Sequence, residues 1–141
     1  MKTMSLKTWF RIGLVNLCFV ALLGLIMRYK IPYDLPELSQ KNLLHAHSHF
    51  AFAGWISHFL YTGFLYILTR YLSEDKLKKY HNILYLNLLA SYGMLFSFTA
   101  FGYNAVSISF STLSVFVSFI FAWYFLKDLK QLPANHRSRP W

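Results

Sequence analysis

The chain has very little cysteine and few charged residues. Of its 141 residues only 13% are charged and five are Asp or Glu, whereas 56% are hydrophobic and 20% are aromatic. A soluble domain of this length needs more polar surface, so the composition excludes an ordinary soluble protein and indicates an integral membrane protein. The single cysteine, Cys18, excludes a disulfide framework and says nothing about the redox compartment.

The shortage of acidic residues leaves a formal net charge of +9. The basic residues do not gather on one face, as a nucleic-acid surface would require, but lie at the ends of apolar segments. The positive-inside rule then places both termini and residues 71–81 on the cytoplasmic side. The charge is therefore interpreted as a topology signal, and no nucleic-acid partner is expected.

Apolar segments long enough to cross roughly 30 Å of hydrocarbon recur along the chain. The first resembles a signal peptide in its basic start, but Arg11, Asn16 and the lack of a small-residue cleavage site favour a retained helix. The expected fold is all-α, a four-helix transmembrane bundle with cytoplasmic N and C termini, forming one transmembrane domain over residues 1–141. The expected helices cover residues of about 9–28, 43–69, 83–103 and 107–126.

The connectors carry their own signals. Pro32 interrupts the first connector, and Asn42 is a candidate N-cap for the second helix. Residues 71–81 are interpreted as a charged loop, and Gly102 predicts a tight turn within residues 101–105. With these assignments the second helix begins at the outer face of the membrane.

Three of the six histidines, His45, His47 and His49, lie within five residues at the start of that helix. Imidazoles beside hydrocarbon are costly, so this cluster indicates a bound ligand. On an unbroken helix, where successive residues turn by about 100°, His45 and His49 share a face and His47 points nearly the opposite way. All three can bind one zinc or copper ion only if the segment is extended or the helix begins after His47.

The face below His47 carries Ala51, Gly54 and His58. Two small residues below a histidine leave a flat surface that a porphyrin plane can occupy, so the pattern is typical of an axial haem ligand inside a helical bundle. His45 stays open as the alternative ligand, although bulkier residues follow on its own face.

The other histidines have weaker patterns around them. His49 is expected to support a ligand or to contact another helix. His58 lies near the middle of the membrane, where an ionisable residue is a functional candidate; the alternative is a neutral ring bonded to a nearby serine or asparagine. His81 and His136 are expected in loops without a functional role.

Residues 44–55, Leu-His-Ala-His-Ser-His-Phe-Ala-Phe-Ala-Gly-Trp, resemble the His-x-His-x-x-x-x-x-x-Gly-Trp helix of small, divergent members of the haem-copper oxidase subunit I superfamily, which includes nitric oxide reductases. The resemblance implies a low-spin haem whose axial ligand is His45 or His47, near the outer end of the second helix and close to Trp55. It also implies a role in respiratory electron transfer or oxygen or nitric oxide chemistry, in a bacterial inner membrane.

The resemblance also implies parts that this sequence does not supply. The second axial histidine and the high-spin haem and copper ligands of the family lie on later helices, whereas residues 83–103 and 107–126 contain no histidine. Further transmembrane helices, from downstream sequence, a second copy or another subunit, are expected to supply the second ligand. The isolated chain is not expected to reduce oxygen.

Two other functions stay open. The histidine cluster could capture zinc or copper for a transporter or sensor in which His58 relays the ion inward; Met94 is the only sulfur ligand deeper in the bundle. Alternatively, the chain could be a non-catalytic assembly subunit whose histidines only pack.

Overall fold

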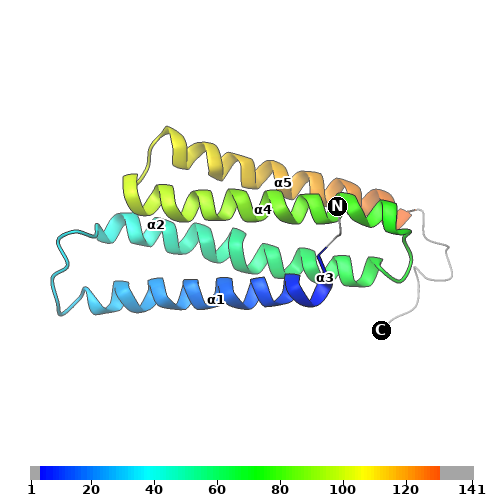
Figure 1. Cartoon of the computed structure of the whole chain (residues 1–141). Coiled ribbons are helices and arrows are strands. Elements are labelled where there is room, and N and C mark those ends of the chain that lie inside the picture. The colour runs from blue at the N-terminus through cyan, green and yellow to red at the C-terminus, as the bar shows by residue number, and fades with distance from the viewer. Residues whose placement is uncertain (1–3, 131–141) are drawn as a thin grey trace.

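The computed structural model describes residues 4–130, and these residues form an all-helical bundle (Figure 1). Within them, four helical segments are long and apolar enough to cross a membrane, which confirms the expected four-span fold. The start of the first span and the end of the last lie at the same end of the bundle (Figure 1). That this end is cytoplasmic stays a prediction. The spans are Leu6–Tyr29, Gln40–Leu68, Glu74–Phe101 and Ala105–Lys130.

The second span is not a uniform α-helix. It consists of α2 (Gln40–Phe50), a π-helix η1 (Ala51–Ser57) and α3 (His58–Leu68). A π-helix has i→i+5 hydrogen bonds and is rare, and it is found frequently at functional sites. The prediction of one continuous α-helix over this span missed η1.

The second span also begins earlier than hydropathy suggests. The side chain of Ser39 accepts a hydrogen bond from the backbone N–H of Asn42, so Ser39 is the N-cap and α2 starts at Gln40. The prediction that Asn42 is the cap is therefore wrong. The first turn of α2 is polar, so hydropathy does not detect it, and the serine at the N-cap is the sequence signal for where the helix starts.

The third span differs most from its prediction. Its helix α4 (Glu74–Phe101) follows Ser73, so most of the expected charged loop at residues 71–81 is helical. Glu74 and Asp75 occupy the first turn, where acidic side chains interact favourably with the positive end of the helix dipole.

The turn between α4 and α5 (Ala105–Lys130) agrees with the sequence. Gly102 has φ +65°, a conformation that glycine adopts most readily. Asn104 then caps α5, because its Oδ1 accepts from the N–H of Ser107 while the Ser107 hydroxyl accepts from the N–H of Asn104.

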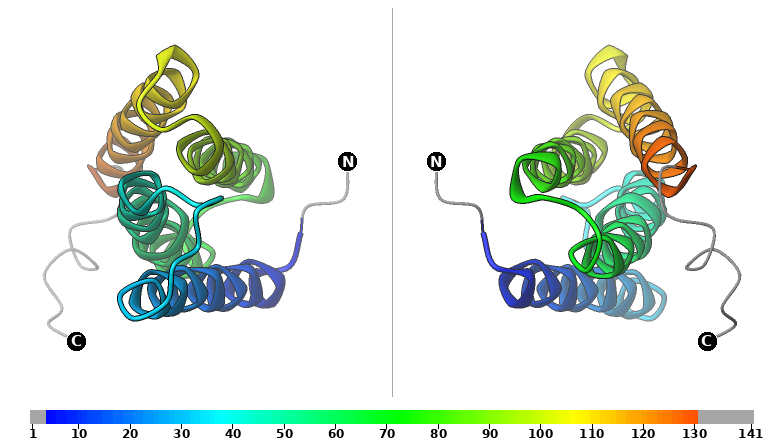
Figure 2. Two further views of the ribbon diagram at one scale, coloured as in Figure 1. Left: turned by 90° about the vertical axis from the view of Figure 1, so that its left-hand side faces the viewer. Right: turned by 90° about the vertical axis from the view of Figure 1, so that its right-hand side faces the viewer.

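The second span is the centre of the bundle. It packs against α1 (Leu6–Tyr29) on one side and α4 on the other, and α4 packs extensively on α5 (Figure 2). In the most apolar window of each helix, 50% of the α4 residues are buried, against 17% in α1 and in α5. The two outer helices therefore leave most of their apolar surface facing outward, which is consistent with contact with lipid.

Candidate functional site

The three clustered histidines point to two different sides of α2. The ring of His45 lies 4.6 Å from that of Tyr103, and the ring of His49 stacks on Phe98 at 4.5 Å. His47 points to α1 instead, where its Cε1 lies 3.5 Å from the position that a Cβ would take on Gly24. The predicted opposition of His47 to the other two is confirmed.

This geometry decides between the alternatives left open for a single metal ion. The helix α2 begins at Gln40 and runs through Phe50, so the segment is neither extended nor helical only after His47. The three rings consequently do not converge. Across residues 4–130, no three His, Cys, Asp or Glu side chains are grouped so that they could hold a metal ion.

His47 has an incompletely satisfied ring. Its Nδ1 is buried and has no hydrogen-bond partner among the residues that the structure describes. A buried polar atom without a partner costs free energy, and most such atoms in proteins are paired. Because Nδ1 is buried, a ligand would have to bind the ring through the other nitrogen, Nε2, which is not among the buried unpaired atoms.

The surface beside His47 differs from the one that the spacing suggested. A Cβ on Gly54 would lie 2.7 Å from Cε2 of Phe50, so the fully buried Phe50 ring fills the space at Gly54. Ala51 packs in the same apolar cluster as Phe50. The glycine that lies against the His47 ring is Gly24 of α1, which is outside the histidine motif.

Trp55, the last residue of the motif, lies partly buried at the same interface. It packs against the apolar cluster below His47 and also lines a cavity of about 310 Å³ between α1 and the second span. The other lining residues of this cavity are apolar: Leu14, Leu17, Ile56, Phe59 and Leu60.

His58 also contacts α1. Gly13 and Gly24 are eleven residues apart, as are His47 and His58, and each glycine lies against one of these histidines. The fully buried His58 ring lies 3.2 Å, through Nε2, from the carbonyl oxygen of Trp9. Since a carbonyl only accepts, Nε2 must carry the proton, and the buried Nδ1 is left as a lone pair without a partner in the described part of the chain. The expected bond to a serine or asparagine is replaced by this bond to the backbone.

His81 is a structural residue that the sequence analysis misplaced. It lies in α4 and not in a loop, is 8% exposed, and its Nδ1 accepts a 2.8 Å hydrogen bond from Nε1 of Trp9. The Trp9 ring contacts both His58, at 5.7 Å, and His81, at 5.9 Å. Helical spacing of Leu77, His81 and Leu84 was the signal that could have placed this residue. His136 lies outside the described residues.

Two buried asparagines hold the π-helix. Asn87 of α4 donates its side-chain amide to the carbonyl oxygen of Ala53 at 3.0 Å, and Asn16 of α1 donates to that of Gly54. The hydroxyl of Tyr92 donates to Oδ1 of Asn16 at 2.7 Å, which orients that amide. The sequence analysis cited Asn16 only as evidence for a retained first helix and did not single out Asn87.

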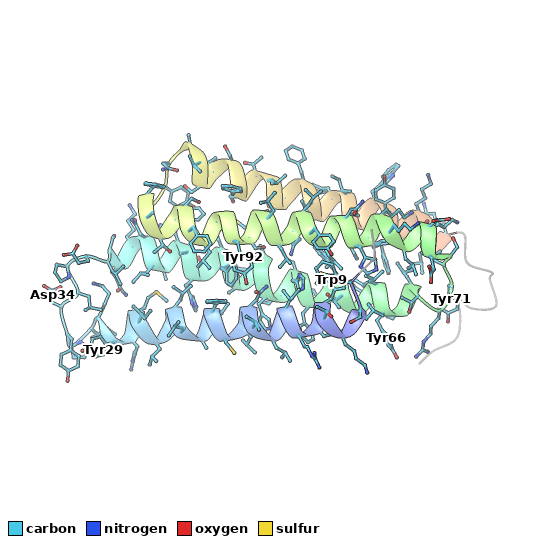
Figure 3. The ribbon with its side chains drawn as sticks, viewed as in Figure 1. Trp9, Tyr29, Asp34, Tyr66, Tyr71 and Tyr92 are labelled. Carbon is cyan, nitrogen blue, oxygen red and sulfur yellow. The ribbon has the colours of Figure 1, made fainter. Side chains whose placement is uncertain are left out.

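The polar groups thus lie at different levels of the bundle. Figure 3 shows Tyr92 nearer the end that carries the first connector and Trp9 nearer the opposite end. His49 lies near the first connector and borders a cavity of about 290 Å³ that Met94 also lines. At the opposite end, the buried Asp128 accepts hydrogen bonds from the Tyr80 hydroxyl and the Lys79 ammonium.

No protein-family model, curated protein or solved structure matches the chain. The arrangement of the histidines is therefore the observation from which a function can be inferred.

Proposed function

We propose that the chain is a haem-binding integral membrane protein of haem-copper oxidase subunit I type, in which His47 is an axial ligand of the iron. It would act in respiratory electron transfer or in oxygen or nitric oxide chemistry, in a bacterial inner membrane. Further transmembrane helices, from downstream sequence, a second copy or another subunit, would supply the second axial ligand.

The observation that carries the proposal is the state of the His47 ring. Nδ1 is buried beside Gly24 of α1 and has no hydrogen-bond partner in residues 4–130, which leaves Nε2 as the nitrogen through which a ligand would bind. A ring held in this way can bind a metal through a single nitrogen, as an axial haem ligand does. His45 and His49 lie instead against the aromatic rings of Tyr103 and Phe98, which supports His47 over His45.

When bound, haem supplies a one-electron iron centre whose potential depends on its axial ligands and their surroundings. The chain itself would contribute the lone pair of His47 and a fixed ring orientation. Gly24 lies beside that ring, where an added Cβ would be in ordinary van der Waals contact with Cε1 at 3.5 Å. The surrounding apolar helices would keep bulk water away from the ligand.

An absorption spectrum of the purified full-length protein, prepared from haem-replete cells with the partners that copurify, tests the proposal. A Soret band is expected, and His47→Ala should abolish it. The matched variant His49→Ala, two residues away on the opposite face of α2, should retain it. A Soret band that survives His47→Ala but not His45→Ala would contradict the assignment of His47.

Colourless protein would refute haem binding altogether. Metal analysis would then separate the rivals. Stoichiometric zinc or copper would support a metal transporter or sensor, and the absence of both would support an assembly subunit.

A further inference from the structure

We infer that Asn16 and Asn87 are positioning residues for His47, because they hold the second span in a π-helical form that sets the direction of the histidine-bearing helix α2. The inference rests on the proposed function only in what it says about haem. The geometric part concerns the backbone of η1 and can be tested without a cofactor.

The two asparagines grip the span from opposite sides. Their amides donate to the consecutive carbonyls of Ala53 and Gly54, one from α4 and one from α1. Asn16 and Asn87 are 0% and 1% exposed and lie inside apolar spans, where an unpaired amide would be costly. Both amides therefore donate their hydrogen bonds to two adjacent residues of η1.

The π-helix needs such partners. Carbonyls inside a π-helix accept from the i+5 N–H groups, but where the π-helix joins the flanking α-helices the pattern changes and some carbonyls have no regular helical donor. Buried carbonyls must then find other donors. The Phe50 ring adds to this arrangement, because it packs over Gly54 in space that a side chain would occupy.

The direction of His47 follows from this arrangement. If the span reverted to a regular α-helix with all its residues, α2 would turn by about 100° and shift by about 1.5 Å relative to α3, the rotation and rise of one residue. His47 would then leave Gly24, and His49 would leave Phe98. By holding the extra residue in η1, the asparagines keep His47 against α1.

A cross-linking experiment tests the positions without haem. In the full chain, with the exposed native Cys18 changed to Ser in every variant, the pair Gly24→Cys and His47→Cys should be joined by a short bifunctional thiol reagent, because the two positions are in contact. Adding Asn16→Leu and Asn87→Leu should lower the yield severalfold. The matched control is Ser91→Ala, which removes a fully buried hydroxyl from α4 that bonds only within its own helix and should leave the yield unchanged.

Deleting one residue from η1 provides the decisive rescue. Deletion of Ala53 lets the span be a regular α-helix while α2 and α3 keep their relative directions, so the double asparagine variant should regain its cross-link. A second pair, Tyr61→Cys and Phe121→Cys, whose native rings stack at 4.1 Å, reports whether α3 and α5 remain packed. An unchanged yield of the cross-link between residues 24 and 47 in the double asparagine variant would overturn the inference. It would also be overturned if deletion of Ala53 from that variant restored neither this cross-link nor the one between residues 61 and 121.

The same variants, carrying the native His47, connect the geometry to the cofactor. The double asparagine variant should lose or shift the Soret band, and deletion of Ala53 should restore it, whereas Ser91→Ala should not move it. If even the unaltered protein is colourless while the cross-links behave as expected, the proposed function fails and the positioning of His47 stands. If the protein binds haem but the cross-links do not respond, the positioning fails and haem binding stands.

Discussion

Replacing Asp128 should show whether a charge pair or a hydrogen bond holds the end of α5 against α4. Asp128 is 2% exposed, and its Oδ2 accepts from the Tyr80 hydroxyl at 2.6 Å and from Nζ of Lys79 at 2.8 Å. Tyr80 is fully buried, whereas the Lys79 side chain is 29% exposed. The two partners should therefore respond differently to the loss of the carboxylate.

The magnitudes follow from that difference. Asp128→Leu leaves the buried Tyr80 hydroxyl without an acceptor, at a cost of about 1–3 kcal/mol. Lys79 can extend its ammonium to water and adds only about 0–1 kcal/mol. We expect Asp128→Leu to lower the free energy of unfolding by about 1–4 kcal/mol, and Asp128→Asn, whose amide oxygen still accepts from Tyr80, by about 0–1 kcal/mol.

Unfolding in detergent micelles, followed by far-UV circular dichroism, measures these differences. Adding Tyr80→Phe to Asp128→Leu should recover part of the loss, because no unpaired hydroxyl then remains. If Asp128→Asn is as damaging as Asp128→Leu, or if Tyr80→Phe gives no recovery, the hydrogen bond is not the main contribution and the reasoning is refuted.

Two further predictions use the same assay. Gly93→Ala should destabilise the bundle by about 1–3 kcal/mol, because its Cβ would overlap the Phe110 ring of α5. Gly63→Ala, whose Cβ would have no atom within 4 Å, should be neutral or stabilising. Equal effects of the two would argue against close α4–α5 contact. His81→Leu should cost about 1–3 kcal/mol by leaving the buried indole N–H of Trp9 unpaired, and His81→Gln should cost less because it keeps an acceptor. Equal losses in the two His81 variants would mean that the hydrogen bond contributes little.

The predictable part of the fold is the part that one helix determines alone. Apolar length defined the four spans, and Gly102 marked the last turn. The opposite directions of His47 and His49 followed from 100° per residue, because α2 is regular over Gln40–Phe50. Each of these features depends on local sequence and on the backbone geometry of a single element.

The π-helix could not be found in this way, because periodicity analysis assumes a constant number of residues per turn. The extra residue in η1 is stabilised by donors from other spans, Asn16 and Asn87, which lie far away in the sequence. Two asparagines inside apolar segments were the available signal, and neither could be paired with Ala53 or Gly54 before the helices were placed.

The start of α4 was missed for a different reason. Its charged first turns have the composition of a loop, although Ser73 followed by Glu74 and Asp75 is also a pattern that begins helices. The prediction followed the composition of residues 71–81 and not this pattern, so it placed His81 in a loop outside the helical bundle. Similarly, the contact of His47 with Gly24 depends on how α1 lies against the second span, which no local signal determines.

The matched spacing of glycines and histidines limits how this protein can evolve. Gly13 lies against His58 and Gly24 against His47, and Asn16 bonds to the backbone between them. A single-residue insertion between the two glycines would break one of these contacts unless the second span lengthened in step. We therefore expect related chains to keep both distances or to change them together, a covariation of segment length that an alignment of such chains can measure.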